Sequence, residues 1–201
     1  MKRLMLASAV AVPLLLAGCA TTSMVPVWRD PTYAAVPVKR VFVAAVIANP
    51  QYTVAFENAV AQAFASQGVQ AATASSVFPP GEVAKGGEVT KEKVVEYVKA
   101  NGAQLLIVMR LTEKTTVEAQ PVTVTTYGYG YGYGVGTAYT TVTYAPATTV
   151  RAESSVYATS TEKLVWSGRS STFDFSSAQQ AGQSAASALL VALAESGILV
   201  K

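Results

Sequence analysis

Histidine is absent from this chain of 201 residues, and cysteine occurs once. Without histidine, neither a Ser-His-Asp triad nor a Cys-His pair can form, so these two classes of nucleophilic enzyme are excluded. Zinc and haem sites that depend on several histidine or cysteine ligands are excluded for the same reason. A single cysteine also excludes a disulfide bond within the chain.

Charged residues are few, at 13% of the chain, and their balance is nearly even. The formal net charge is +3, and Lys2 and Arg3 contribute two of these positive charges. Nucleic-acid-binding proteins need a basic surface, so this balance predicts no nucleic-acid partner.

Acidic residues give little support to catalysis by paired carboxylates, because the chain has only two aspartates. Glu113 and Glu118 form one conceivable pair, but a regular strand directs residues an odd number apart to opposite faces. Glu153 and Asp174 form the other, and exposed strand charges commonly face each other across a hairpin. We therefore expect no enzymatic activity, no catalytic residue, no metal site and no dissociable cofactor.

The N-terminus is typical of a bacterial signal peptide. Two basic residues precede an apolar run over residues 4–16, which is shorter than the ~20 residues needed to span a bilayer. The run ends in Leu16, Ala17, Gly18 and Cys19. This sequence resembles the lipobox of bacterial lipoproteins, in which a leucine and two small residues precede the cysteine that receives the lipid.

The lipobox resemblance implies that Cys19 becomes the first mature residue and carries diacylglycerol on sulfur and a fatty acyl group, such as palmitate, on its amine. Several acyl chains together anchor a protein stably, because each buried CH₂ contributes ~0.8 kcal/mol. Ala20 follows, rather than the aspartate that resembles an inner-membrane retention signal in enteric bacteria. We therefore expect a lipid-anchored protein on the periplasmic face of the outer membrane of a Gram-negative bacterium.

A proline-containing segment separates the lipobox from the rest of the chain. Residues 20–38 hold three prolines and show no periodicity, which is typical of an extended spacer. We divide the chain into a signal peptide (1–18), a lipidated N-terminus with a tether (19–38) and one α/β domain (39–201).

The first half of that domain alternates strands and helices. Residues 41–48 form a continuous apolar run typical of a strand buried on both faces. Asn49 and Pro50 then match an N-cap and a first helical residue, and apolar residues recur at helical spacing up to Gly68. The further elements expected are a strand over residues 69–73, a helix from Thr90 through Lys99 and a strand over residues 105–111.

The second half is rich in threonine and valine, as half-buried strands are. We expect strands over residues 112–126, 137–144, 148–159 and 163–173, and a last helix over residues 178–196 capped by Ser176 or Ser177. The whole pattern predicts an α/β (α+β) fold, a single sandwich in which about three helices pack a mixed β-sheet.

A low-complexity run, YGYGYGYGVG, occupies residues 127–136 between two expected strands, so we place it at the tip of a long hairpin. Tyrosine suits binding surfaces because its ring is amphipathic and has few torsions to immobilise. Tyr127, Tyr129, Tyr131 and Tyr133 are therefore the candidate partner contacts. The alternative is a loop whose composition arose by repeat slippage, without a function.

From residue 39 to about residue 200 the chain resembles small bacterial envelope lipoproteins that carry an uncharacterised α/β domain. The motifs that carry this resemblance are VFVAAVIANP, the AFENAV helix, TKEKVVEYVKANGAQLLIVMRL, the Tyr/Gly-rich insertion, EKLVWSG and the Ala-rich closing helix. The domain is also distantly similar to penicillin-binding-protein activator and curli-secretion lipoproteins. This resemblance implies binding rather than catalysis.

Two functions remain open at this point. One is a binding or scaffolding module for another envelope component, such as a protein of peptidoglycan synthesis. The other is a passive structural or stress-responsive envelope lipoprotein without a dedicated partner.

Overall fold

A computed structural model describes residues 21–80, 90–117, 121–127, 137–143, 147–173 and 175–199. The elements in chain order are β1 (Thr21–Arg29), β2 (Arg40–Val46), α1 (Pro50–Ser66), β3 (Gln70–Thr73), the 3₁₀ helix η1 (Ala74–Ser76), α3 (Lys91–Ala100), β4 (Leu105–Val117), β5 (Pro121–Tyr127), β6 (Thr137–Thr143), β7 (Ala147–Ala158), β8 (Lys163–Phe173) and α4 (Ala178–Glu195).

Six of the strands form one open, mixed sheet in the order β1-β8-β7-β4-β2-β3, while β5 and β6 pair only with each other. β2 runs parallel to β3 and β4. The β4–β7, β7–β8 and β8–β1 pairs are antiparallel. The parallel pairs follow from the strand-helix order of the first half, because a parallel connection needs a crossover of helical length. The α+β fold expected from the sequence is confirmed.

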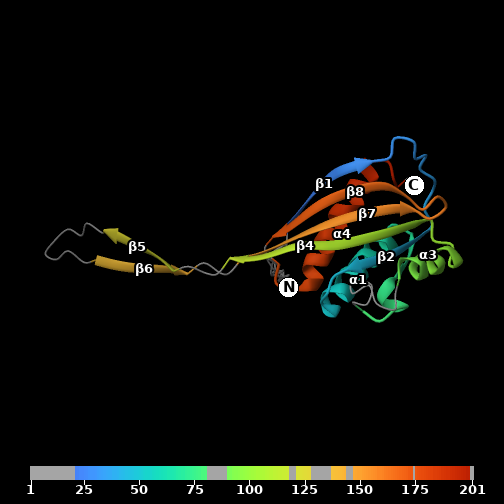
Figure 1. Ribbon diagram of the computed structural model, residues 1–201. Helices are drawn as coiled ribbons and strands as arrows, with labels where there is room; N and C mark the ends of the chain where they lie inside the picture. Colours follow the sequence, from blue (N-terminus) through green and yellow to red (C-terminus); the bar gives the residue numbers. More distant parts are fainter. Residues whose placement is uncertain are drawn as a thin grey trace, which may run out of the picture.

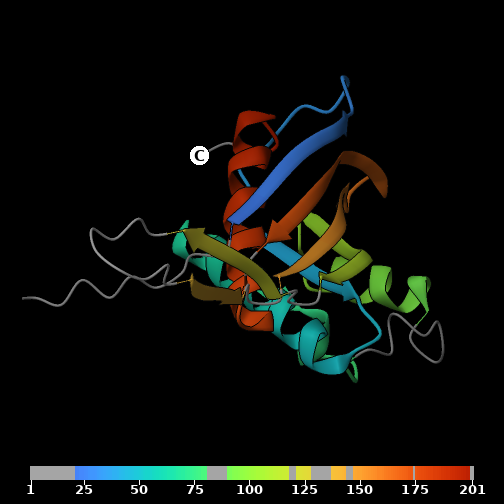
Figure 2. The same ribbon diagram turned by 90° about the vertical axis from the view of Figure 1, so that its left-hand side faces the viewer.

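The α-helices lie on both faces of the sheet, with α1 and α4 on one face and α3 on the other (Figures 1 and 2). The larger core lies under α1 and α4, where Trp166 and Leu189 are fully buried. The smaller core lies under α3, where Phe42 meets Val98. Alternate residues of β2 therefore enter both cores, which explains why the apolar run of this strand is unbroken.

The helix ends carry the side chains that the sequence predicts. Asn49 caps α1, since its side-chain oxygen accepts the Gln51 N–H at 2.9 Å. Ser177 caps α4 and accepts the Gln180 N–H at 3.1 Å. Gly197 follows α4 with a φ of +66°, a conformation that glycine adopts at no steric cost.

The segment expected to be a tether contains β1, which pairs with β8 along its whole length. Met24 packs against the larger core, and Tyr33 does so beyond the strand. Pro26 fits because an edge strand needs no N–H donor on its free side. Residues 21–29 are therefore part of the sheet rather than a spacer, whereas the signal-peptide prediction lies outside the described residues.

Candidate functional site

The predicted contact residues fall at one hairpin. Tyr127 is the last residue of β5 and stands opposite Thr137 of β6. Tyr129, Tyr131 and Tyr133 lie outside the described residues, as does Cys19. Their roles in contact and lipid attachment therefore stay predictions.

The β5–β6 hairpin projects away from the body of the molecule (Figure 1). β4 and β7 are paired as far as Val117 and Ala147, and β5 and β6 continue beyond them. We call residues 118–146, which connect β4 to β7, the arm. No charged residue lies between Glu118 and Arg151, and this stretch holds six of the ten tyrosines of the chain.

The base of the arm and the start of β1 lie at the same end of the sheet. Thr115 pairs with Thr149, Thr149 with Phe173, and Phe173 with Thr21. Neighbouring strands are about 4.8 Å apart, so this row places Thr21 within about 15 Å of Thr115. Cys19 precedes Thr21 by two residues, which adds at most about 7 Å. The expected lipid attachment and the arm thus belong to one end of the molecule.

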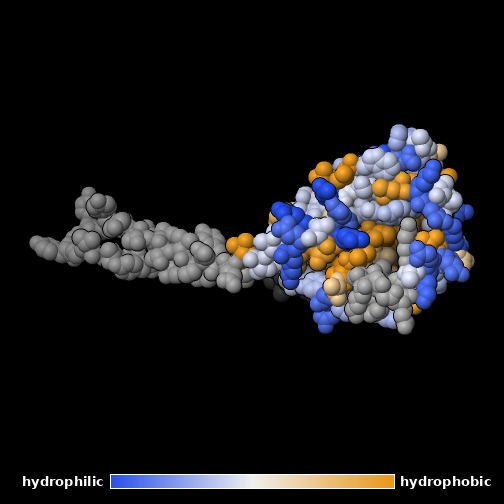
Figure 3. Space-filling model, in the orientation of Figure 1, coloured by the Kyte–Doolittle hydropathy of each residue, from blue (hydrophilic) through white to orange (hydrophobic). Residues whose placement is uncertain are grey.

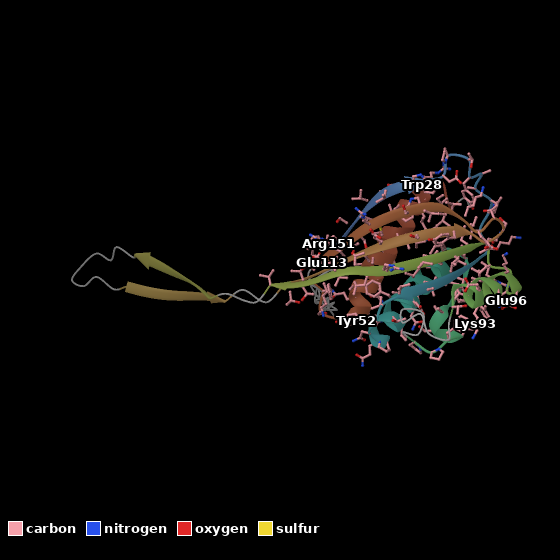
Figure 4. All side chains as sticks on the ribbon, in the orientation of Figure 1. Trp28, Tyr52, Lys93, Glu96, Glu113 and Arg151 are labelled. Carbon is pink, nitrogen blue, oxygen red and sulfur yellow. The ribbon has the colours of Figure 1, made fainter. Side chains whose placement is uncertain are left out.

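The two described carboxylates that the sequence offered for acid catalysis are both ion-paired, Glu113 at an exposed position and Glu153 at a half-buried one. Glu113 bonds Arg151 at 2.5 Å, and Glu153 bonds Arg169 at 2.9 Å. A hydrogen bond from the hydroxyl of Thr115, followed by the Arg151 guanidinium, holds the pKa of Glu113 below its ordinary value. Figure 4 labels Glu113 and Arg151 where β4 and β7 approach the arm.

Glu118 and Asp174 lie outside the described residues. One S-x-x-K sequence, residues 160–163, lies in the turn between β7 and β8, where all four residues are exposed. Within the described ranges, no three acidic or cysteine side chains are placed to hold a metal ion.

Sequence analysis did not identify Glu57, a fully buried carboxylate on α1. Its Oε1 accepts the Ala45 N–H at 2.8 Å, and its Oε2 accepts the Ser75 N–H at 2.7 Å. Burial raises the pKa of Glu57, and these hydrogen bonds partly oppose the shift. In the sequence, Glu57 reads as an ordinary charged residue of an amphipathic helix, so nothing there indicates that its side chain is buried.

Sequence analysis also missed a groove on the face that carries α3. Its volume is about 480 Å³, and side chains of β2, β4, β7 and α3 line it. Apolar residues form its floor and wall, namely Ala44, Val46, Val94, Val95, Val98, Leu106, Val108 and Tyr157. Figure 3 shows this apolar surface hollowed into the face of the sheet. The strand sequences are those of an ordinary sheet and give no sign of a groove. The groove is formed by the position of α3 beside β2, β4 and β7.

No helix in the described part of the chain combines the length and the apolar character needed to cross a membrane.

Comparisons with known proteins show the fold alone. No protein-family profile and no curated protein matches the chain. A single-residue variant of PelC from Paraburkholderia phytofirmans, a dodecamer, aligns with a TM-score of 0.50 and 14% identity over 84% of this chain and 96% of that chain.

Two further structures are similar at lower scores. The PelC dodecamer in another crystal form aligns with a TM-score of 0.48 and 14% identity over 84% of this chain and 95% of that chain. Lipoprotein GNA1162 from Neisseria meningitidis aligns with a TM-score of 0.42 and 16% identity over 78% of this chain and 98% of that chain. The dodecameric state belongs to PelC and the lipoprotein description belongs to GNA1162. The expected resemblance to activator and curli-secretion lipoproteins stays a prediction.

Proposed function

We propose that this chain is a lipid-anchored lipoprotein on the periplasmic face of the outer membrane, where it acts as a binding or scaffolding module for another envelope component. Cys19 is its anchor and the arm is its contact element. The module has no enzymatic activity of its own. Its partner is an envelope protein, with the machinery of peptidoglycan synthesis as one source.

The observation that carries this proposal is the row that joins Thr115, Thr149, Phe173 and Thr21 across the sheet. It puts the base of the arm at the end of the sheet where β1 begins, and the proposed anchor, Cys19, precedes β1 by two residues. A chain anchored through Cys19 therefore holds its arm close to the bilayer. A partner within or beside the membrane lies within reach of such an arm, whereas one deep in the periplasm does not.

The composition of the arm supports a contact role. Its tyrosines offer ring surface at low entropic cost, and the absence of charged residues beyond Glu118 leaves little to desolvate when another protein covers them. Its glycines give up more backbone freedom on ordering than other residues do, so binding must offset that loss. A contact of this kind is expected to be specific and of moderate affinity.

Photo-crosslinking in living cells tests the contact. A photoreactive amino acid replaces Tyr131 in the arm, and the matched control carries it at Lys93, which is exposed on α3. One dominant protein adduct from position 131 that is absent from position 93 supports the proposal. Adducts of equal pattern from both positions, with the protein folded and membrane-bound, contradict it and favour the passive lipoprotein.

A separate variant tests the anchor. Cys19→Ser removes the acyl acceptor and is expected to move the protein out of the membrane fraction, with no lipid-modified N-terminal peptide by mass spectrometry. If Cys19→Ser leaves acylation and membrane attachment unchanged, the anchor assignment is wrong, whatever the arm binds.

A further inference from the structure

The groove beside α3 has the shape and the charge of a site for a small amphiphile. A volume of about 480 Å³ falls within the range of about 300–1,000 Å³ typical of small-molecule sites. Such sites are mostly apolar with a few placed polar groups, and this groove has that composition. The residues along the groove indicate which kind of molecule it can hold.

The groove lies where α3 leaves its face of the sheet uncovered. α3 is a single helix of 10 residues, about 10–12 Å across with its side chains. Five strand spacings of about 4.8 Å make the sheet about 24 Å wide. α3 buries Phe42 and Ala44, but Val46, Leu106, Val108 and Tyr157 beside it stay only partly buried. They form an apolar strip over β2, β4 and β7 that no described side chain covers.

A free cation stands on the same face as this strip. Leu106, Val108 and Arg110 alternate along β4, so their side chains share one face of the sheet. Arg110 lines the groove, and its guanidinium makes no hydrogen bond or ion pair with any described residue. Its cross-strand neighbour on β7 is Glu153, but that carboxylate is engaged by Arg169 at 2.9 Å.

Among the described residues, the charges around Arg110 leave one positive charge unpaired. Arg110, Arg151 and Arg169 stand against Glu113 and Glu153 on this part of the face, and the two ion pairs use two of the three arginines. Among the other cations and anions that line the groove, Lys99 is paired with Glu162. The remaining guanidinium can bond a carboxylate with two parallel N–H donors.

We propose that the groove binds a fatty-acid carboxylate, with the acyl chain along Val46, Leu106, Val108 and Tyr157 and the carboxylate on Arg110. The strip of half-buried apolar residues calls for an unbranched apolar chain, and the unpaired arginine calls for an anionic head. This site is independent of the anchor and the arm, so it holds whether or not Cys19 is acylated.

Isothermal titration with hexanoate, octanoate and decanoate below their micelle concentrations tests the proposal. The titrated protein is the chain from residue 20 to residue 201, which retains every described element. One carboxylate is expected to bind per chain, and the affinity should rise by up to about fourfold with each added CH₂ that enters the groove. Absence of saturable binding, or an affinity that does not depend on chain length, overturns the proposal.

Two variants with matched controls locate the site. Val108→Glu places a charge in the floor of the groove and should abolish decanoate binding. Val25→Glu makes the same change on β1, where Val25 is 62% exposed and outside the groove, and should bind as the native chain does. Circular dichroism checks that both variants are folded, and equal binding by both overturns the location.

The head group is tested at an exposed residue whose replacement does not disturb the core. Arg110→Gln should weaken decanoate binding at least tenfold while leaving the binding of decanol unchanged. Lys93→Gln removes the same charge from an exposed residue of α3 that does not line the groove and should change neither. If Arg110→Gln leaves decanoate binding unchanged, the assignment of the carboxylate to Arg110 is wrong.

Discussion

Glu57 is a single side chain that joins three segments of the chain. Beyond Val43 the pairing of β2 with β3 ends, and the Ala45 N–H donates to the Glu57 carboxylate instead of to a strand. The same carboxylate accepts the N–H and the hydroxyl of Ser75 in η1. An unpaired buried N–H costs about 1–3 kcal/mol. The Glu57 carboxylate avoids that cost by accepting the hydrogen bond that a neighbouring strand would otherwise accept.

The titration of Glu57 predicts a pH dependence of stability. Burial raises its pKa in the folded chain above the ordinary 4.5, so the folded state binds its proton more tightly than the unfolded state. This contribution to stability is complete below pH 4.5 and is lost as the pH rises through the folded-state value. Each pKa unit of upward shift corresponds to about 1.4 kcal/mol.

Glu57→Gln removes this titration. The unfolding free energy of the native chain minus that of the variant should therefore be largest near pH 4 and fall as the pH rises. Urea denaturation of both chains between pH 4 and pH 8 measures the difference. A difference that is constant, or that grows with pH, contradicts the assignment.

Gly168 illustrates a residue that close packing requires. A Cβ added there would lie 2.8 Å from Cζ2 and 3.1 Å from Cζ3 of Trp166, whose ring is fully buried and donates its N–H to Ser196 at 2.9 Å. Because the Trp166 ring is buried and tethered by this hydrogen bond, it has little room to move away from an added Cβ. Gly168→Ala should therefore lower the free energy of unfolding by about 1–3 kcal/mol, although alanine is the better strand residue.

Urea denaturation followed by tryptophan fluorescence measures this loss. Ser167→Ala, one residue away on the opposite face of β8, is the matched control and should change stability by less than about 0.5 kcal/mol. Gly168→Ala with native stability would show that the ring has room to move.

The arm is an element that the body of the fold does not need. β4 and β7 are already paired at Val117 and Ala147, so a two-residue Asn-Gly turn can close the hairpin at that point. Replacing residues 118–146 with Asn-Gly should leave the free energy of unfolding within about 1 kcal/mol of the native value, since every described core residue is retained. Urea denaturation and circular dichroism of the shortened chain measure this.

A shortened chain that fails to fold would contradict this independence and make the arm part of the body. The informative control replaces the same residues with a flexible glycine-serine segment of equal length. If the glycine-serine chain is as stable as the Asn-Gly chain, the turn itself is not the source of stability, and the role of the arm lies outside folding.

The elements show which parts of the fold the sequence can predict. α1, α3 and α4 carry a capping residue, a helical apolar pattern and a glycine shortly after the last turn, and all of these signals are local. β1 was not predicted because its residues pair with β8, which follows about 140 residues later in the chain. Its prolines indicated a spacer, and no local signal distinguishes a spacer from an edge strand that contains Pro26.

At the scale of the molecule, the sequence predicts the layers but not which features share an end of the sheet. The pattern of strands and helices predicts a mixed sheet packed by about three helices, and this is what the structure shows. The register of β1, β8, β7 and β4 determines that the arm and the start of β1 share one end, and register depends on contacts across the whole sheet. The groove likewise depends on the width of α3 relative to the width of the sheet.

The molecule is therefore expected to have a fixed orientation on a membrane. Leu106, at the groove, and Thr115, at the base of the arm, are nine residues apart on β4, which is about 30 Å of strand. If Cys19 is held in the bilayer, the base of the arm lies near the lipid, and α3 lies on the side that faces away from it. The groove then opens toward the periplasm rather than into the membrane.

Fluorescent labels at two engineered cysteines test this orientation, because Cys19, the one native cysteine, is blocked to labelling if it carries the proposed acyl groups. Thr116→Cys places a label at the base of the arm and Glu96→Cys places one on α3 (Figure 4 labels Glu96); both positions are exposed. The lipidated proteins are reconstituted into vesicles with spin-labelled phospholipid. Quenching should be several-fold stronger at position 116, because collisional quenching falls off within a few ångströms. Equal quenching at both positions, or stronger quenching at position 96, would show that the anchored molecule lies on its side or is inverted, and the arm would then lose its access to partners at the membrane.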